Sequence, residues 1–307
     1  MTQGCRIDVR FFAPPSEFAD CFTSIYRLEL SIEDEQAGCR AVDWLQPEWG
    51  NLRVFSGDMP AAQVAHGAIV ADARFTATGP SAKATRFELG ATRMWGVGLL
   101  PLGWARIVRR PASRYANMLA DAERHPDFAR FAGLTTVFDG KCDDDAEYAR
   151  IVEVLRQFDA PVADGDRIRA VHSAMVELGL ASVSEFAEHA GLSVRALERI
   201  CRRHFGFPPK LLLRRQRFMR SLAAWMIGGM GRWSRAIDEL YTDQAHFNRD
   251  FHAFMGMGPS EYAALPHPIL SAFMGERARV WGSPAQTLDR PGGAAGNPAA
   301  TGEHRAR

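Results

Sequence analysis

The sequence predicts an α+β protein, in which a β-rich N-terminal domain, residues 1–160, precedes an all-α domain, residues 161–280. Two observations support this prediction. Short extended runs bounded by turn residues follow one another through the first half. The second half has helical periodicity and contains an internal repeat of about 50 residues. The remaining residues, 281–307, are rich in Gly, Ala and Pro, and we expect a disordered tail there.

The composition is that of a globular protein with about two domains. Of the 307 residues, 47% are hydrophobic and 24% are charged, which excludes a disordered, collagen-like or coiled-coil chain. The longest apolar stretch, Trp95–Trp104, is broken by Gly and Pro and has about half of the ~20 residues that a membrane-spanning helix needs. We therefore expect no membrane partner.

The cysteines and the first residues favour a cytoplasmic protein. The five cysteines include no CxxC pair, so neither a disulfide framework nor a structural zinc site is expected. Charged side chains lie within Met1–Arg10, where a signal peptide would have an apolar core. Both features suit a reducing compartment.

Six extended runs are predicted in the first half: Phe22–Leu30, Cys39–Leu45, Asn51–Phe55, Gly67–Phe75, Ala84–Leu89 and Arg93–Leu99. A helix is predicted after them, because Asp143–Asp145 is suited to cap a helix and apolar residues then recur with helical spacing from Tyr148 to Phe158. The segment Asp159–Asp166, rich in Pro, Gly and Asp, is predicted to be a linker.

Basic residues are concentrated in one part of the second half. Residues 1–160 hold 18 Lys and Arg against 22 Asp and Glu, a net charge of −4, whereas residues 161–307 hold 19 against 14, a net charge of +5. Within Val194–Arg220, nine basic residues accompany a single acid, Glu198. Such a segment attracts polyanions, although a solvated helical face gives the same pattern.

The internal repeat pairs residues at an offset of 50: Leu197 with Phe247, Arg199 with Arg249, Gly206 with Gly256, Pro209 with Pro259 and Leu212 with Tyr262. Upstream of the turn the offset is 49, so the second copy has one more residue in its turn. Two copies are too few for a solenoid and indicate a duplicated small helical module.

The first copy has the pattern of a helix-turn-helix. The buried face of its two helices is predicted to comprise Val183, Phe186, Ala187, Ala190, Leu197 and Ile200. Gly191 suits the tight turn, Leu192 fills it, and Ser193 is a predicted N-cap. The opposite face of the second helix presents side chains that are long enough to reach a DNA major groove: Arg195, Glu198, Arg199, Arg202 and Arg203.

The second copy is less regular. The apolar face of its first helix is predicted to comprise Trp233, Ala236, Ile237 and Leu240, with Leu240 at the position of the turn glycine. Thr242–Asp243 is suited to cap the next helix. Between the copies, Pro208–Pro209 begins a long helix from Lys210 to about Trp225, which the glycines of Gly228–Gly231 end. This helix is expected to hold the two recognition helices about 34 Å apart, one duplex turn.

These residues resemble the AraC/XylS family of transcriptional regulators. The matching positions are Ala187, Gly191, Leu192, Ser193, Leu197, Arg199 and Phe205–Pro209 in the first copy, and Tyr241–Phe251, Gly256 and Pro259–Tyr262 in the second. The resemblance spans Asp166–Leu265 and implies a double helix-turn-helix domain of seven helices that binds promoter DNA. Cys201 and Leu240 depart from the pattern, which usually has Phe and Gly there.

The resemblance implies base contacts from both recognition helices: Arg195, Glu198 and Arg199 in the first, and Gln244, His246 and Arg249 in the second. Phosphate contacts are expected from Arg202, Arg203, Lys210, Arg214 and Arg215. Arg195 and Arg199 are suited to bidentate contact with guanine, and Glu198 to accepting from a cytosine amino group. The expected partner is double-stranded promoter DNA, with RNA polymerase, a small-molecule effector and a second copy of the chain as further candidate partners.

The N-terminal region permits two interpretations. The runs Trp44–Leu52 and Gly96–Trp104 are similar to the sensor-like N-terminal domains of some AraC-like regulators. Six aromatic residues are candidates either to line a ligand pocket or to form the core of a β-rich domain: Trp44, Trp49, Phe55, Phe75, Trp95 and Trp104. Sensing of a small ligand and dimerisation are the two roles that this resemblance suggests.

Other functions find less support in the sequence. The motifs GxxxxGK[ST], HExxH and GxSxG do not occur, so we expect neither an enzyme nor a cofactor. His66 and His125 have no partner at metal-ligand spacing, so no metal site is expected. Cys201 lies beside Ile200 on the predicted buried face, which makes it a packing residue rather than a nucleophile. The alternative to DNA binding is a helical adaptor module whose basic face docks on an acidic protein partner without specific DNA readout.

Overall fold

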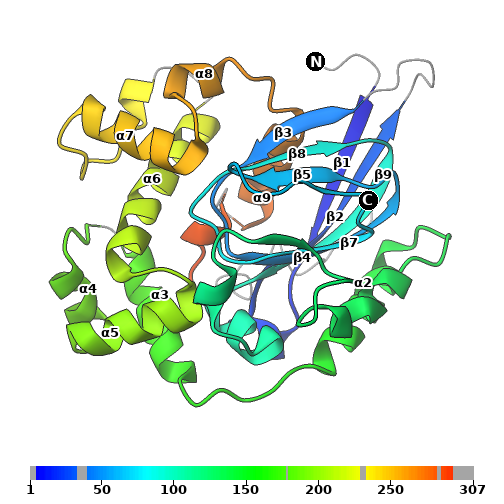
Figure 1. Ribbon diagram of the computed structural model, residues 1–307, viewed down its shortest axis with the longest axis horizontal. Coiled ribbons are helices and arrows are strands. Elements are labelled where there is room, and N and C mark those ends of the chain that lie inside the picture. The colour runs from blue at the N-terminus through cyan, green and yellow to red at the C-terminus, as the bar shows by residue number, and fades with distance from the viewer. Residues whose placement is uncertain (1–4, 33–39, 178, 229–232, 282–284, 293–307) are drawn as a thin grey trace, which may run out of the picture.

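The structure is a computed structural model that describes residues 5–32, 40–177, 179–228, 233–281 and 285–292. Two antiparallel sheets lie beside a helical region (Figure 1). The strands are β1 (Cys5–Phe12), β2 (Phe22–Ile32), β3 (Ala41–Leu45), β4 (Gly50–Gly57), β5 (Ala61–Val64), β6 (Val70–Ala71), β7 (Phe75–Thr78), β8 (Thr85–Leu89), β9 (Thr92–Leu99) and β10 (Leu119–Asp121). The α-helices are α1 (Pro101–Gly103), α2 (Asp144–Arg156), α3 (Gly165–Val176), α4 (Val183–His189), α5 (Val194–Ile200), α6 (Pro209–Ile227), α7 (Gln244–Met255), α8 (Pro259–Ala263) and α9 (Pro268–Trp281). The α+β prediction is confirmed.

The two sheets have the strand orders β1-β2-β9-β4-β7-β10 and β3-β8-β5-β6. Strand β9 pairs with β2 on one side and β4 on the other, and it is buried along its whole length. Gly96 on β9 is required by close packing, because a Cβ at this position would overlap the ring of Tyr26 on β2. The strand therefore has covered faces, which explains why its sequence is apolar rather than alternating.

Five of the six predicted extended runs contain a strand of similar extent. The prediction of a single strand over Gly67–Phe75 is wrong. Asp72 has a φ of 58°, and this left-handed residue separates β6 from β7. Strands β1, β5 and β10 were not predicted, and β10 has only 3 residues, too few for a periodic pattern.

The predicted helix after the sheets is α2, and it begins as expected. The side chain of Asp143 accepts hydrogen bonds from the backbone N–H groups of Asp145 and Ala146, both at 3.1 Å. The first turns then place the buried carboxylate of Glu147 against the larger sheet. It accepts from Trp95 Nε1 at 2.6 Å and pairs with Arg93 at 2.8 Å, which fixes the helix on β9.

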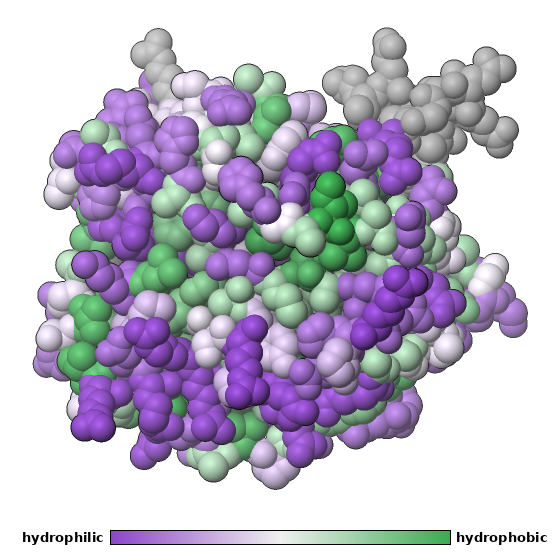
Figure 2. All heavy atoms as spheres, in the orientation of Figure 1, coloured by the Kyte–Doolittle hydropathy of each residue, from purple (hydrophilic) through white to green (hydrophobic). Residues whose placement is uncertain are grey.

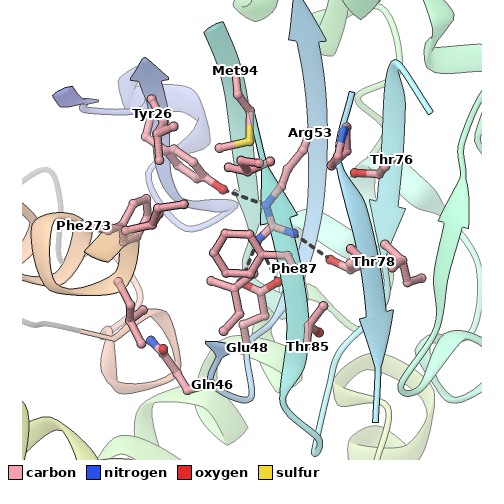
Figure 3. Close-up of a pocket in the computed structure, with 18 of the residues that line it drawn as sticks. Tyr26, Gln46, Glu48, Arg53, Thr76, Thr78, Thr85, Phe87, Met94 and Phe273 are labelled. Atoms are coloured by element: carbon pink, nitrogen blue, oxygen red, sulfur yellow. Dashed lines mark hydrogen bonds and ion pairs between the residues drawn. The ribbon is translucent and has the colours of Figure 1, made fainter. Parts of the chain in front are cut away.

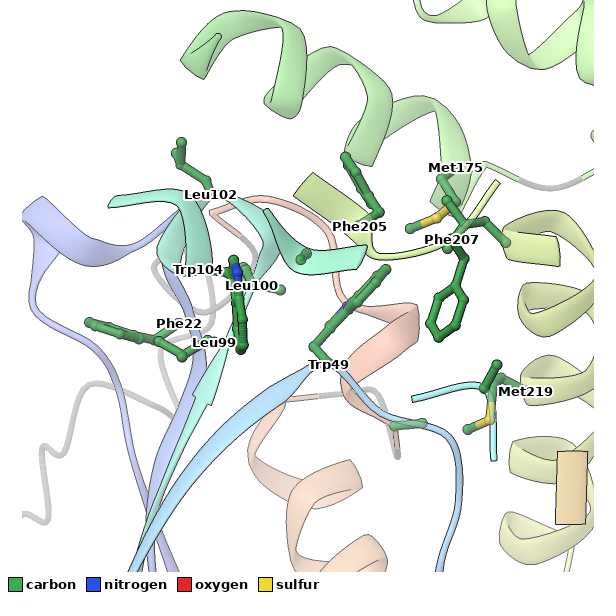
Figure 4. Packing of buried hydrophobic residues seen from close by; sticks show 14 of the residues in the cluster. Phe22, Trp49, Leu99, Leu100, Leu102, Trp104, Met175, Phe205, Phe207 and Met219 are labelled. Carbon is green, nitrogen blue, oxygen red and sulfur yellow. The ribbon is translucent and has the colours of Figure 1, made fainter. Parts of the chain in front are cut away.

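The sheets and the helical region share one hydrophobic cluster. Trp49 lies between them: its ring is 5.8 Å from that of Phe205, which follows α5, and 6.2 Å from that of His172 on α3. Figure 4 shows Trp49 between Trp104, on the side of the sheets, and Phe205 and Phe207, on the side of the helices. The helical region is therefore packed on the N-terminal part through buried aromatic rings.

The C-terminal segment differs from its prediction. Helix α9, expected to belong to the helical domain, packs against β1 and β3 of the N-terminal part. The buried carboxylate of Asp43 on β3 accepts from the backbone N–H groups of Ile269 at 3.0 Å and Leu270 at 2.8 Å, and so fixes the start of α9. A carboxylate that caps a helix more than 200 residues away has no local sequence signal.

The prediction of a disordered tail from residue 281 is wrong for residues 285–292, whereas residues 282–284 and 293–307 lie outside the described part of the chain. Gln286 and Thr287 are buried against the N-terminal part. The side chain of Gln286 is hydrogen-bonded to that of Asn51, and the carbonyl of Thr287 accepts from Gln216 on α6 at 2.6 Å. The segment thus joins the sheets to α6 in spite of its Gly/Ala/Pro-rich surroundings.

Candidate nucleic-acid interface

The first helix-turn-helix is formed by α4 and α5, and its caps are those that the sequence predicts. Ser193 caps α5 by accepting from the backbone N–H of Ala196 at 3.3 Å. Ser182 and Glu185 form a capping box at the start of α4. Gly191 has a φ of 64°, a left-handed conformation that glycine adopts without strain. These features fix the angle between the two helices and hence the direction in which α5 points.

Helix α5 buries one face and presents a charged one. Leu197, Ile200 and Cys201 are fully buried, whereas the side chains predicted to contact DNA are exposed: Arg195, Glu198, Arg199, Arg202 and Arg203. Two of them have acidic partners. Arg202 pairs with Glu198 at 3.1 Å, and Arg199 lies 3.5 Å from Asp164, which precedes α3. Hydrophilic side chains predominate in the lower left of Figure 2, where Figure 1 places α4 and α5.

The second unit has a recognition helix but lacks the predicted helix before it in the described residues. Trp233–Arg235 forms a single 3-10 turn, and the prediction of a helical apolar face from Trp233 to Leu240 is wrong. Asp238 provides the physical reason. Its backbone N–H donates to Ser221 Oγ at 2.9 Å, and its carboxylate accepts from the N–H of Leu240 at 3.0 Å. These bonds replace the helical ones.

Helix α7 is the second recognition helix. Asp243 caps it, as predicted, by accepting from the N–H of His246 at 2.6 Å. Of the residues predicted to contact bases, Gln244 and Arg249 are exposed and His246 is half-buried. The ring of His246 lies 5.1 Å from that of Tyr241, so it is more confined than its two neighbours.

A groove of about 610 Å³ joins the two units along the linker helix α6. Its basic residues come from the linker helix α6 and from α7 of the second unit: Lys210, Arg214, Arg217, His246 and Arg249. Asp250 is the one acidic residue that lines it, and its buried carboxylate pairs with Arg214 at 2.5 Å. The groove therefore has an excess of positive charge, and four of its basic residues are among those predicted to contact DNA.

The predicted phosphate contacts divide into three classes. Arg202, Arg203 and Lys210 are exposed and available to a phosphate. Arg214 is half-exposed, with Asp250 as its partner. Arg215 is fully buried, so the prediction of a phosphate contact is wrong for it in this conformation. Burial without a nearby acid lowers the pKa of Arg215 to about 9, since desolvation disfavours the charged form.

Two residues that line the groove were not predicted, Arg217 and Asp250. Arg217 lines the groove from α6, donates to the carbonyl of Leu240 at 3.0 Å and stacks on Tyr241 at 4.6 Å. Arg217 was part of the basic segment, but helical spacing alone does not separate it from its solvated neighbours. Asp250 has an acidic side chain on the buried face of α7, and that position was the only sequence signal for its pairing with Arg214.

Cys201 has the packing role that the sequence predicts. Its thiol is fully buried behind α5, and burial raises its pKa above the ordinary value for a thiol. Such a thiol is neutral and inaccessible. The described residues contain no group of three or more His, Cys, Asp and Glu side chains that is suited to hold a metal ion. The helices of the described part include none with the length and apolar character to span a membrane.

A second cavity, of about 70 Å³, lies between the two sheets and is closed by α9. Most of its lining is apolar, and Phe55 alone among the six predicted aromatic residues contributes to it. The polar part centres on Arg53, whose guanidinium donates to both carboxylate oxygens of Glu48, at 2.7 and 2.8 Å, and to Tyr26 Oη at 2.9 Å (Figure 3). This cavity is the candidate ligand site, and the sequence did not indicate Arg53 or Glu48.

Comparison with known families identifies the helical region. The model of a helix-turn-helix domain family matches residues 186–264, which include both recognition helices and α6. The chain carries an AraC-type helix-turn-helix domain. This domain confirms the resemblance found in the sequence and supports a DNA-binding transcriptional regulator.

Comparison with solved structures gives weak similarity to two regulators. ToxT from Vibrio cholerae O395 has 10% sequence identity and a TM-score of 0.39, over 85% of this chain and 97% of that one. ToxT bound to (E)-4-(8-methylnaphthalen-1-yl)but-3-enoic acid has 9% identity and a TM-score of 0.40, over 85% and 98%. The AraC-like transcriptional activator CuxR has 13% identity and a TM-score of 0.30, over 71% and 87%. No curated protein matches the chain.

Proposed function

We propose that this AraC-type protein is a sequence-specific transcriptional regulator that binds two adjacent major grooves of promoter DNA, one with α5 and one with α7. The groove along α6 is the observation that carries the proposal. It places Lys210 and Arg214 of the linker helix beside His246 and Arg249 of the second unit. Helix α6 has 19 residues and is about 28 Å long, comparable to the ~34 Å between successive major grooves on one face of a duplex.

In this proposal, side chains of the two recognition helices divide between bases and phosphates. Arg195 and Arg199 are candidates for bidentate contact with guanine, and Gln244, His246 and Arg249 for the second box. Exposed Arg202, Arg203 and Lys210 displace counterions from phosphates. Arg199 must exchange Asp164 for a base, and this exchange costs little because the pair is half-exposed and separated by 3.5 Å.

Salt-dependent binding tests the phosphate assignments. Lys210→Ala removes one exposed cation from the groove, so the slope of log Kobs against log[salt] is expected to fall in magnitude by about 1. Arg215→Met is expected to leave that slope unchanged, since Arg215 is buried. Fluorescence anisotropy of a labelled duplex between 50 and about 300 mM salt measures both slopes. Arg124→Ala, at an exposed arginine of the N-terminal part, is the matched control, and equal slopes for Lys210→Ala and this control would contradict the assignment.

Glu198→Ala tests base reading by α5. An acid near phosphates lowers affinity, so Glu198 is expected to serve selectivity, either by accepting from a cytosine or by orienting Arg202, 3.1 Å away. The substitution should relax the preference at one base position and raise affinity for unrelated duplexes. Selected-pool sequencing with both proteins measures this, and an identical base preference refutes the role.

The cavity between the two sheets, hereafter the sandwich cavity, supports a second part of the proposal, the sensing of a small ligand. Its lining is mainly apolar, with the Arg53–Glu48 pair and Tyr26 among its polar groups, which suits a small apolar molecule that carries one polar group. The adaptor alternative is an outcome of the same experiments: a protein that captures acidic partners through α5 would bind DNA without base preference.

A further inference from the structure

The contact between the N-terminal part and the linker helix is built around a buried cation. The Arg215 guanidinium lies 3.9 Å above the ring of Trp49, and its Nη1 donates to the carbonyl of Ser81 at 3.0 Å. Among the described residues, no carboxylate pairs with it, and its Nε and Nη2 atoms have no hydrogen-bond partner. Stacking on Trp49 and one hydrogen bond therefore offset the desolvation of a full charge, which makes the contact marginal in free energy.

The loop that receives Arg215 also holds the second recognition helix. This loop comprises residues 79–84 and connects β7 to β8. The N–H of Ala84 donates to the carbonyl of Phe254 at 2.7 Å, and Lys83 Nζ donates to that of Ala253 at 2.6 Å. Both acceptors lie in the last turns of α7. One loop of the N-terminal part thus fixes α6 and α7 together.

The same loop is bonded to the wall of the sandwich cavity. Gln46, Pro47 and Glu48 line the cavity, and Trp49 is the next residue in the chain. The carbonyl of Glu48 accepts from the N–H of Ser81 at 2.9 Å, while its carboxylate binds Arg53 inside the cavity. A displacement of Glu48 is therefore transmitted both to the Trp49 ring and to the loop.

From these contacts we propose that Gln46–Trp49 and residues 79–84 form a clamp through which occupancy of the sandwich cavity controls the relative orientation of the two recognition helices. A molecule or side chain that fills this cavity of about 70 Å³ must displace or re-pair Glu48, because Glu48 lines the cavity and is bonded there to Arg53, which already has Tyr26 as its other partner. This movement withdraws Trp49 from Arg215. The exposed guanidinium regains its hydration, and this regain stabilises the open clamp. The inference rests on the proposed function, since it concerns how DNA is read.

The closed clamp is expected to make binding depend on the spacing of the two DNA boxes. One added base pair rotates the second box by about 35° about the duplex axis and moves it by about 3.4 Å. A rigid pair of recognition helices cannot follow this change, whereas an open clamp lets the second unit adjust about α6. Opening of the clamp should therefore weaken the preference for one spacing of the two DNA boxes. The affinity for a single box should not change.

Four variants test the clamp. Trp49→Leu removes the stacked ring, and Lys83→Met removes the bond to α7 while sparing the core. Ala62→Leu fills the cavity and serves as the probe for occupancy, because Ala62 lines it from β5. Arg215→Met removes the buried charge and is expected to hold the clamp closed. The matched controls are Lys141→Met and Ala71→Leu, at exposed positions.

The measurement is the ratio of affinities for the selected two-box duplex and for the same duplex lengthened by one base pair. Trp49→Leu, Lys83→Met and Ala62→Leu should each lower this ratio by about tenfold, with single-box affinity within twofold of the wild type. Ala62→Leu combined with Arg215→Met should restore it. If Trp49→Leu and Lys83→Met fold and keep the wild-type ratio, the clamp is overturned. If the ratio falls in these two variants but not in Ala62→Leu, the link between the clamp and the cavity is overturned.

Amide hydrogen exchange provides a readout that does not depend on DNA. Opening of the clamp should speed exchange at Ser81 and Ala84, whose N–H groups bond to Glu48 and Phe254, in Ala62→Leu relative to Ala71→Leu. Faster exchange in a protein that prefers no DNA site would refute the proposed function and leave the clamp standing. Unchanged exchange at both amides would overturn the clamp, whatever the DNA result.

Discussion

Phe251→Ala is expected to lower the free energy of unfolding by about 3–5 kcal/mol, the range for removing a large aromatic side chain from a packed core. The side chain is fully buried at the centre of the second unit. Its ring lies 5.0–5.6 Å from four others, those of Phe218, Trp233, Phe247 and Tyr262. Because the described residues before α7 contain only one 3-10 turn, Trp233–Arg235, aromatic packing is a main contact that holds α7 in place.

Urea unfolding followed by far-UV circular dichroism measures the loss. Ile227→Ala is the control, since that side chain is 62% exposed at the end of α6 and should change stability by less than about 0.5 kcal/mol. A loss below about 1 kcal/mol for Phe251→Ala would contradict the packing of the second unit. The variant is also expected to retain the first DNA box and lose the second.

Acid is expected to destabilise the protein by about 3 kcal/mol between pH 6.5 and pH 4 through His172 alone. Burial lowers the pKa of His172 to about 4, and the positive charge of Arg215 acts in the same direction, whereas Asp20 and the backbone of Asp289 act against it. The unfolded chain, with an ordinary histidine pKa near 6.5, binds more protons in this window. Stability must therefore fall as the pH decreases, and the loss is complete near the pKa of the folded state.

Thermal or urea unfolding of wild type and His172→Gln at pH 7.0, 5.5 and 4.5 tests this expectation. The difference in stability between the two proteins should shift in favour of the variant as the pH falls. Burial also lowers the pKa of His204, so the variant keeps part of the acid sensitivity. A difference that does not change with pH would show that His172 is accessible to protons in the folded protein.

Local signals made the first helix-turn-helix predictable. The N-cap Ser193, the left-handed Gly191 and the apolar spacing of α5 act over fewer than five residues, so the sequence contains all the information. The second unit was predicted only in part, because Asp238 is held by Ser221, 17 residues away. A side-chain hydrogen bond between residues so far apart in the sequence leaves no periodic pattern there.

The errors have a common physical cause, which is contact between distant segments. Arg215 belongs to the same basic segment as the exposed Lys210, and it is buried by packing on Trp49, which is far away in the sequence. Helix α9 follows the same principle, since Asp43 on β3 fixes its start. The cavity pair of Arg53 and Glu48 is visible only once β4 and its preceding segment are folded together.

Selection from a random double-stranded DNA pool with the purified protein tests the central claim, that two recognition helices read two adjacent grooves. The account predicts an enriched site with two short boxes about one helical turn apart, and loss of one box when the selection is repeated with Arg249→Ala. Arg124→Ala should return the same site as the wild type. A pool without enrichment, bound in a manner that only salt controls, would contradict sequence-specific recognition and favour a basic surface that docks on an acidic protein partner.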